Sequence, residues 1–260
     1  MTQPDAMDIL TRIEDDILTI TFNRPAKKNA ITAAMYQTLA DALRTGEADT
    51  SVRAILICGQ PEIFTAGNDL EDFMKSPPHD DDSPVFQFLT AISTAQKPLV
   101  AAVRGAAVGV GTTLLLHCDL VYAGKGARFS LPFVQLGICP EAASSLLLPQ
   151  MIGYHHAAAK LLLGEPFGAD EALAMGFVNQ VLDDDAVLAH ARAQAAKLAA
   201  LPASSIRTTK RLMKGDAAGD VAARMQKEGV AFRAMLASPE AREAFTAFFE
   251  KRKPDFKKFA

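Results

Sequence analysis

Three short, strongly apolar runs constrain the fold of this chain more than any other feature of its sequence. They occupy residues 54–58, 98–103 and 120–123. A short run that is apolar at nearly every position is typical of a strand buried on both faces, as in a parallel sheet. Residues 17–22 (ILTITF) alternate apolar and polar side chains and predict a further strand. Helical segments lie between these strands, so the sequence predicts an α/β layered fold with parallel strand pairing.

Helical spacing marks the segments between and after these runs. Residues 32–48 place Met35, Leu39 and Leu43 on one helical face, with Thr32 at the position of an N-cap. Beyond about residue 142 we expect no further strands. Helices are expected there at residues 154–163, 169–175, 184–200, 202–213, 221–237 and 239–248. The sequence therefore predicts a βα core over residues 1–200 and a helical C-terminal region over residues 201–260.

Composition narrows the class of function. Lys and Arg number 27 against 30 Asp and Glu, a net charge of −3, which argues against a nucleic-acid binder held by a broad basic field. The first eight residues lack the basic start and apolar stretch of a signal peptide. No apolar run approaches the roughly 18 residues of a membrane span. Cys58, Cys118 and Cys139 are far apart, which predicts reduced thiols and no metal site. We expect a cytoplasmic protein.

Two segments rich in small residues follow predicted strands and lead into predicted helices. Residues 64–70 (FTAGNDL) indicate a tight turn with Asp69 as a helix cap. Residues 105–113 (GAAVGVGTT) indicate a second strand-to-helix junction, which leads into a helix expected at residues 112–118. Such junctions expose backbone N–H groups, which suit an anion or a developing oxyanion. A plain connection in the first segment and close helix–strand packing in the second are the alternatives. The second segment matches neither a P-loop nor G-x-G-x-x-G.

A single carboxylate lies in a third segment, residues 136–149 (LGICPEAASSLLLP), which is otherwise apolar or small. If Glu141 is buried, its pKa is raised toward neutrality, as a general base requires. If it is exposed in the first turn of a helix after Pro140, it only complements the helix dipole. The sequence alone leaves both interpretations open.

These segments, in this order, resemble the enoyl-CoA hydratase/isomerase (crotonase) superfamily. The resemblance begins at residues 23–31 (NRPAKKNAI) and continues through 66–70, 105–113, 119–123 and 129–132. It ends with residues 172–179 (ALAMGFVN) and a basic tail at 251–258. The resemblance implies a spiral of ββα units with a C-terminal helical part that packs in a homotrimer or a dimer of trimers.

The resemblance also implies a ligand and its binding residues. The ligand is an acyl-CoA thioester, with no metal and no cofactor beyond the coenzyme A of the substrate. Its thioester oxygen is expected between the backbone N–H groups of Asn68 and Val110. The adenine is expected near Ala66 and residues 26–28, and the basic tail with Phe256 near the phosphates. The implied substrate-binding residues are Ala26, Lys28, Ala66, Gly67, Asn68, Asp69, Leu70, Gly109, Phe133 and Phe256.

The residues at two positions narrow the choice of reaction within the superfamily. Hydratases of this superfamily use two glutamates, and the corresponding positions here hold Thr113 and Phe133. The segment PEAASS, residues 140–145, resembles instead the peroxisomal type of Δ3,Δ2-enoyl-CoA isomerase, in which one glutamate is the base. The resemblance therefore implies an isomerase with Glu141 as its base. An enoyl-CoA hydratase and a non-catalytic module that binds CoA esters are the alternatives.

Overall fold

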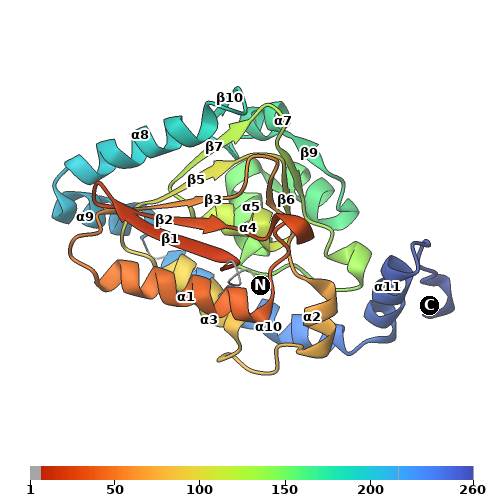
Figure 1. The fold of residues 1–260 in the computed structure, drawn as a ribbon. Helices are drawn as coiled ribbons and strands as arrows, with labels where there is room; N and C mark the ends of the chain where they lie inside the picture. Colours follow the sequence, from red (N-terminus) through yellow and green to blue (C-terminus); the bar gives the residue numbers. More distant parts are fainter. Residues whose placement is uncertain (1–6, 216, 260) are drawn as a thin grey trace, which may run out of the picture.

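The computed structural model describes residues 7–215 and 217–259. It contains two sheets, and the chain winds between them as a spiral (Figure 1). The larger sheet has six strands in the order β1-β2-β3-β5-β7-β10. All neighbours in it pair in parallel except β1 and β2, which form an antiparallel pair. Its strands are β1 (Ile9–Glu14), β2 (Ile17–Phe22), β3 (Ala54–Cys58), β5 (Leu99–Val103), β7 (Leu120–Gly124) and β10 (Gln180–Leu182).

The smaller sheet has four short strands in the order β4-β6-β8-β9. These are β4 (Ile63–Thr65), β6 (Ala106–Val108), β8 (Arg128–Ser130) and β9 (Phe167–Gly168). Three times in succession the chain passes through a strand of the large sheet, then a strand of the small sheet, then one or more helices. This repetition is the ββα spiral that the sequence resemblance implied.

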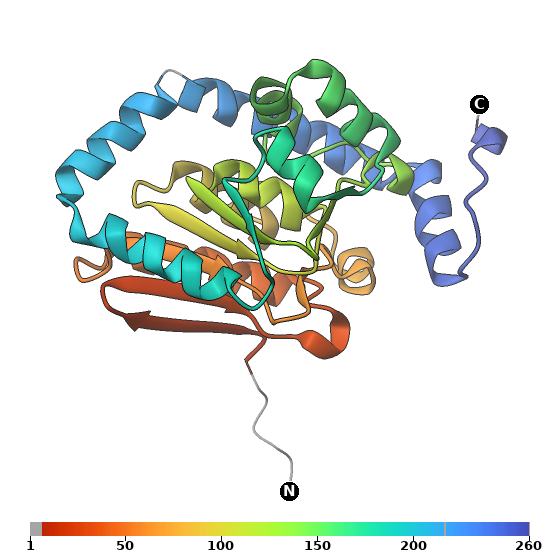
Figure 2. The ribbon, with the colours of Figure 1, turned by 90° about the horizontal axis from the view of Figure 1, so that it is seen from above.

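One face of the large sheet is covered by α8 (Val187–Ala200), which lies over β3, β5 and β7 (Figures 1 and 2). The helix presents small residues at four-residue spacing, and Ala191, Ala195 and Ala199 pack with alternate side chains of β3 and β5. Alanine at these positions lets the helix approach the sheet closely. The apolar runs of β3 and β5 are buried at all five positions each, because the opposite face is covered too.

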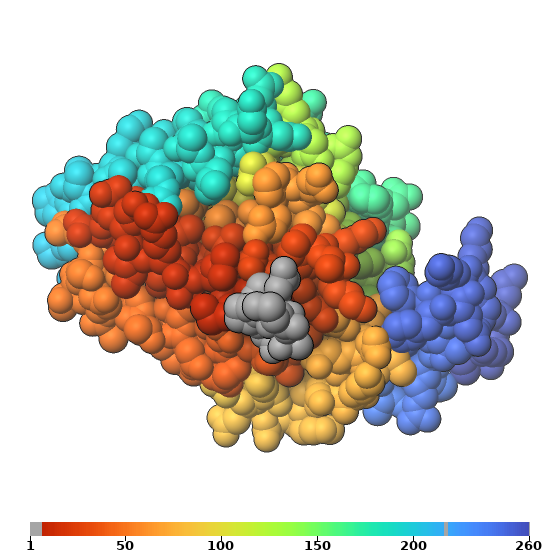
Figure 3. Space-filling view, viewed as in Figure 1, coloured from red at the N-terminus to blue at the C-terminus, as the bar shows by residue number. Residues whose placement is uncertain are grey.

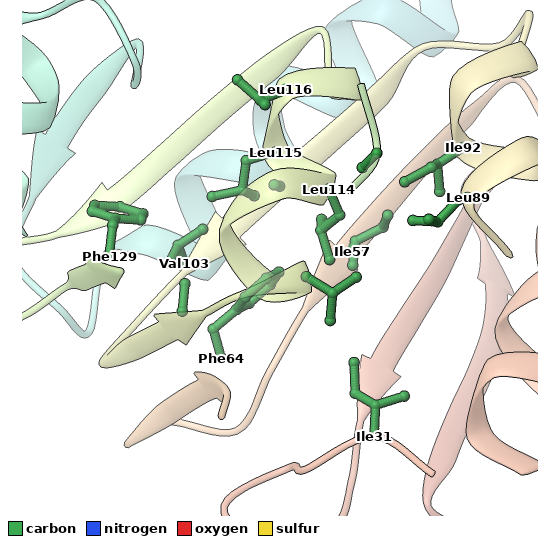
Figure 4. Close-up of a cluster of buried hydrophobic side chains, with 14 of the residues drawn as sticks. Ile31, Ile57, Phe64, Leu89, Ile92, Val103, Leu114, Leu115, Leu116 and Phe129 are labelled. Carbon is green, nitrogen blue, oxygen red and sulfur yellow. The ribbon is translucent and has the colours of Figure 1, made fainter. Parts of the chain in front are cut away.

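The opposite face carries the main core (Figure 4). There α1 (Ala33–Ala48) and α3 (Pro84–Thr94) pack beside a helical segment formed by α4 (Val110–Thr113) and the 3₁₀ helix η2 (Leu114–His117). Figure 4 shows Leu114 on the side of Ile57, Leu89 and Ile92, with Leu115 and Leu116 on the other side of the same helical segment. The predicted cap of α1 is confirmed, since the Thr32 side chain accepts a hydrogen bond from the Met35 N–H.

Two sequence predictions about secondary structure are wrong. Strands do occur after residue 142, because β9 and β10 are short extensions whose hydrogen bonds are completed by β8 and β7. Strands of two and three residues leave no periodic pattern to detect. The helix expected from Thr112 begins earlier, at Val110, and continues as a 3₁₀ helix. Here three-dimensional packing and not the local pattern fixes the start of the helix.

The chain between β8 and α8 is mainly helical. It contains η3 (Val134–Leu136), α5 (Ser144–Ile152), α6 (Tyr154–Ala158), a π-helical turn (Ala159–Leu163) and α7 (Ala169–Ala174). Two shorter helices precede it in the chain, η1 (Pro25–Lys27) and α2 (Leu70–Lys75).

Past the end of α8 the chain is helical. It forms α9 (Ala203–Lys214), α10 (Ala217–Leu236), α11 (Pro239–Phe249) and η5 (Lys257–Phe259). Figure 3 shows the C-terminal residues as a lobe at one side of the body. The lobe packs against the residues at the end of η3 through α11. The approach is close, since a Cβ atom on Gly137 would lie 2.7 Å from the backbone nitrogen of Ala241. Leu212, Met213 and Phe248 are exposed on these helices.

The three cysteines are free thiols, as predicted. No helix within residues 7–215 and 217–259 combines the length and the apolar character needed to cross a membrane. The expectation about a signal peptide concerns residues 1–8, and most of that segment lies outside the described residues.

Candidate active site

Two turns meet at one edge of the small sheet. Strands β4 and β6 are parallel and pair Thr65 with Ala107, so the residues that follow them lie side by side. The approach is tight, since a Cβ atom on Gly67 would lie 2.7 Å from the carbonyl oxygen of Val108. Gly67 and Gly109 both have positive φ, at +83° and +55°, which favours glycine. Both segments form turns, as predicted, and the structure brings the two turns side by side.

Each turn presents one backbone N–H group without an acceptor among the described residues. Asn68 bridges Ile31 in parallel, and the bonds of that bridge use the Gly67 carbonyl and the Asp69 N–H. The N–H of Asn68 therefore points away from Ile31. Val110 is the first residue of α4, where an N–H has no carbonyl one turn earlier to bind. Two adjacent N–H groups of this kind form a site for a carbonyl oxygen that gains negative charge.

Side chains on both turns are held by buried partners. The hydroxyl of Tyr36 donates a hydrogen bond to Oδ1 of Asn68. Asp69 caps α2 by accepting from the Asp72 N–H, and its other oxygen lies 2.7 Å from a guanidinium nitrogen of Arg24. The Val110 side chain is 2% exposed and belongs to the main core. These contacts hold the backbone of both turns in place. None of them uses the N–H group of Asn68 or Val110.

Glu141 is buried, with 6% of its surface exposed. The hydroxyl of Thr113 donates to its Oε1. Its Oε2 has no hydrogen-bond partner and is one of two buried side-chain polar atoms in this state among the described residues, the other being Nε of Arg53. Burial raises the pKa of Glu141 to about 8, against the lowering effect of the Thr113 hydrogen bond. The interpretation of Glu141 as an exposed helix residue is excluded, because α5 begins only at Ser144.

The described part of the chain surrounds a cavity of about 620 Å³ next to these turns. Of the residues singled out from the sequence, those that line it are Lys28, Ala66, Gly67, Asn68, Asp69, Leu70, Gly109, Val110 and Phe133. Ala26, Phe256 and Glu141 are not among the lining residues. Ala26 precedes Lys27, which does line the cavity, and Phe256 follows the lining residue Pro254 by two positions.

Glu141 is nevertheless coupled to both turns. Thr113, which binds its carboxylate, lies one turn after Val110 in α4. Tyr36, which binds Asn68, has a pKa raised well above its ordinary value, first by burial and second by the negative charge of Glu141. Glu141 is thus connected through Thr113 to the segment that begins with Val110, and through the charge it exerts on Tyr36 to the turn that contains Asn68. This arrangement combines a proton acceptor with an oxyanion site.

The C-terminal region forms the opposite wall of the cavity through Ala244, Phe245, Phe248, Phe249, Arg252 and Pro254. This wall is held by Glu243, whose carboxylate accepts hydrogen bonds from Arg252, Lys258 and the Asp255 N–H. Those partners hold the pKa of Glu243 well below its usual range. Residues 7–215 and 217–259 contain no cluster of three His, Cys, Asp or Glu side chains arranged to hold a metal ion.

Three residues that support the site were not predicted from the sequence. Tyr36 binds Asn68, and His117 and Glu228 bind the loop that follows Glu141. The sequence does contain a signal that could have identified Glu228. Residues 225, 228 and 232 lie on one face of α10, and Glu228 there stands between Met225 and the buried Phe232. A carboxylate within an apolar helical face indicates a buried partner. Tyr36 and His117 carry no comparable signal, because each fits an ordinary helical core position.

Known proteins resemble the whole chain. A family model described as Enoyl-CoA hydratase/isomerase matches residues 12–259. The crystal structure of an enoyl-CoA hydratase/isomerase from Pseudoalteromonas atlantica T6c is 44% identical, covers 96% of this chain and 99% of its own, and superposes with a TM-score of 0.91. The 2,3-dehydroadipyl-CoA hydratase of Escherichia coli K12 is 32% identical over 96% of this chain and 98% of that protein.

An isomerase is among the relatives as well. Enoyl-CoA delta isomerase 2 of Rattus norvegicus is 36% identical over 96% of this chain, which spans 65% of the length of that relative. The family is therefore shared by hydratases and isomerases. Its fold is the spiral described above, and its members' names refer to CoA thioesters. The protein belongs to the enoyl-CoA hydratase/isomerase (crotonase) superfamily and is an enzyme of the enoyl-CoA hydratase/isomerase type.

Proposed function

We propose that the protein is a Δ3,Δ2-enoyl-CoA isomerase, which converts 3-enoyl-CoA to 2-trans-enoyl-CoA with Glu141 as its only acid–base group. The observation that carries this proposal is the unpaired Oε2 of the buried Glu141. The two positions that hold glutamates in hydratases are occupied by Thr113 and Phe133, neither of which can exchange a proton near neutral pH. Moving a double bond by one carbon requires a single base.

The reaction proceeds in two proton transfers. Oε2 of Glu141 takes a proton from C2 of the 3-enoyl-CoA, and the electron pair of that bond spreads over the diene to the thioester oxygen. The protonated Glu141 then delivers the proton to C4, and the dienolate collapses to the 2-enoyl thioester. The same proton leaves C2 and returns at C4. The reaction is redox-neutral, so the proposal includes no cofactor beyond the coenzyme A of the substrate.

The surroundings of Glu141 suit this role. A base is most effective when its pKa lies near the working pH, and burial raises the pKa of Glu141 to about 8. Thr113 fixes Oε1, which leaves Oε2 as the reactive oxygen. The N–H groups of Asn68 and Val110 stabilise the negative thioester oxygen by roughly 3 kcal/mol each in the absence of water.

The rest of the cavity supplies the binding surface for coenzyme A. We assign Lys28, Ala66 and residues 67–70 to the nucleotide and pantetheine part, because they line the cavity beside the two turns. Gly109 and Phe133 line the acyl part. Ala26 and Phe256 are assigned to the outer rim, since each is near a lining residue in the chain. A cytoplasmic location is part of the proposal.

The proposal is tested by giving the purified enzyme 3-enoyl-CoA and 2-enoyl-CoA in separate reactions and following both products. An isomerase forms 2-trans-enoyl-CoA from the first substrate and little 3-hydroxyacyl-CoA from the second. Rapid hydration of 2-enoyl-CoA would identify a hydratase instead, as the name of the E. coli relative would imply. Tight binding of both esters without turnover would identify a non-catalytic module.

We further propose that the enzyme is a homotrimer or a dimer of trimers. The apolar side chains exposed on the C-terminal helices support this, since Leu212 is 73% and Met213 is 81% exposed in the isolated chain. Light scattering at micromolar concentration measures the mass directly. A monodisperse species near 28 kDa would contradict the proposal.

A further inference from the structure

We propose that Glu228 is a positioning residue, which holds the loop that carries the base; this inference rests on the proposed function. Glu228 lies on α10, 87 residues after Glu141, and is 6% exposed. Its carboxylate accepts three hydrogen bonds, from the Ala143 N–H at 2.6 Å, the Ser145 N–H at 3.0 Å and the Ser145 hydroxyl at 2.5 Å. All three donors lie two to four residues after Glu141.

The loop needs an acceptor from elsewhere because of its backbone. Ala142 and Ala143 both adopt the left-handed conformation, with φ of +60° and +55°, which is costly for residues other than glycine. Ala143 is also the N-cap of α5 and has no side chain that could cap the helix. Glu228 supplies the missing cap, and its negative charge complements the N-terminal end of α5.

The other side of the same loop is fixed by two further hydrogen bonds. Nε2–H of His117 donates to the Ala142 carbonyl oxygen at 2.8 Å, and the Ser144 hydroxyl donates to the Glu141 carbonyl oxygen at 2.6 Å. Burial lowers the pKa of His117 to about 4, so the imidazole is neutral near pH 7. Among the described residues, Glu228 is therefore the one anionic side chain from outside this loop that binds it.

The two carboxylates also interact through their charges. The negative charge of Glu228 raises the pKa of Glu141, after burial. Burial also raises the pKa of Glu228 itself, while its hydrogen bonds from Ser145 and Ala143 and the charge of Arg224 favour its ionised form. The other titratable or charged groups that face the pair are Tyr36 on α1, Cys139 in the same loop and Arg224 on α10, whose guanidinium donates to the Ser145 hydroxyl. Removing the charge of Glu228 should lower the pKa of Glu141 and loosen its loop at once.

The experiment compares Glu228→Gln with Asp220→Asn, a neutralised and exposed carboxylate on the same helix, in the full-length enzyme with 3-enoyl-CoA. We expect Glu228→Gln to lower kcat by roughly thirtyfold to a hundredfold, the scale of a misplaced reacting group, with KM changed less than about threefold. We expect the acid limb of its kcat/KM profile to move to lower pH. Glu228→Asp keeps the charge, so it should restore the position of the limb but not kcat.

A merely structural role gives a different result. Glu228→Gln would then have a lower melting temperature, while kcat per folded protein and the acid limb would match those of Asp220→Asn, which would overturn the inference. If Glu228→Gln does not fold by circular dichroism, Ser145→Ala removes one of the three donors. An unchanged kcat in Ser145→Ala would overturn the inference, and a fall of about threefold or more with KM unchanged supports it.

A second comparison separates this inference from the proposed function. In a Glu141→Gln background, Glu228→Gln should lower the residual turnover by less than about twofold, because its effect passes through Glu141. A full additional loss there would overturn the positioning role. Normal turnover in Glu141→Gln alone would instead refute the proposed base, whatever the result for Glu228→Gln.

Discussion

Glu141 and Glu243 are buried to nearly the same degree, at 6% and 8% exposure, yet their environments shift their pKa values in opposite directions. Glu141 lies in the core, and one of its oxygens has no partner. Glu243 lies in the C-terminal region and binds two cationic side chains and a backbone N–H. The pKa of Glu141 is raised to about 8, whereas that of Glu243 is held well below its usual range.

The comparison teaches that burial alone does not determine the role of a carboxylate. A buried carboxylate with full partners is ionised and stabilises the fold, while one with an open oxygen is available to exchange a proton. Arg252 links the two regions, because it binds Glu243 and lines the cavity beside the turns.

The largest effect is expected from Glu141→Gln, which removes the proton acceptor but keeps the shape of the side chain. We expect kcat for 3-enoyl-CoA to fall by about a thousandfold or more, since no other carboxylate stands at the Thr113 or Phe133 position. Binding of the CoA ester, measured by calorimetry, should remain within a few-fold. Retention of more than about a tenth of the wild-type kcat would exclude Glu141 as the base.

The next effect concerns the oxyanion site. Val110→Pro deletes the N–H and should lower kcat by about a hundredfold or more, whereas Val110→Gly keeps it and should change kcat less than about tenfold. Val110→Gly should also cost at least about 1 kcal/mol of stability, because glycine in a helix costs about that much and the Val110 side chain also packs in the core. Both variants are compared only if circular dichroism and ester binding are retained. A folded Val110→Pro enzyme with near-normal turnover would place the oxyanion elsewhere.

A smaller effect is expected from Thr113→Val, which removes the donor to Oε1 of Glu141. A base must be deprotonated, so kcat/KM should rise with pH and level off above the pKa of about 8. Losing a hydrogen bond that favours the charged form raises this pKa further, and the acid limb should move to higher pH. At pH 7 kcat/KM should fall by roughly fivefold to tenfold. A limb that stays in place would contradict the assigned role of Thr113.

The smallest effects are on stability, and they should have opposite signs. The raised pKa of Glu141 stabilises the fold below about pH 4.5, and this contribution is lost as pH rises through 8. The lowered pKa of Glu243 gives a contribution that is present above about pH 4.5 and lost at lower pH. Glu243→Gln should therefore lower the melting temperature by a few degrees at pH 7, and the difference should shrink toward pH 3. As the pH rises from 5 to 9, the melting temperature of the wild type should fall relative to that of Glu141→Gln. Parallel curves for the two variants would refute the contrast.

The features that depend on local pattern could be predicted from the sequence alone. Apolar runs predicted β3, β5 and β7, and the cap at Thr32 predicted the start of α1. The ordered motifs, through their resemblance to a family, predicted the ββα spiral. These features are readable because hydrophobic periodicity and capping act within a few residues.

The roles that depend on partners distant in the chain became clear only from the three-dimensional arrangement. The sequence left Glu141 either buried or exposed, and the choice was made by Thr113 and by the loop that Glu228 holds from α10. The short strands β9 and β10 likewise exist because β8 and β7 offer them hydrogen-bond partners. A carboxylate's pKa and a two-residue strand both depend on neighbours that local sequence does not contain, so the fold had to bring them together first.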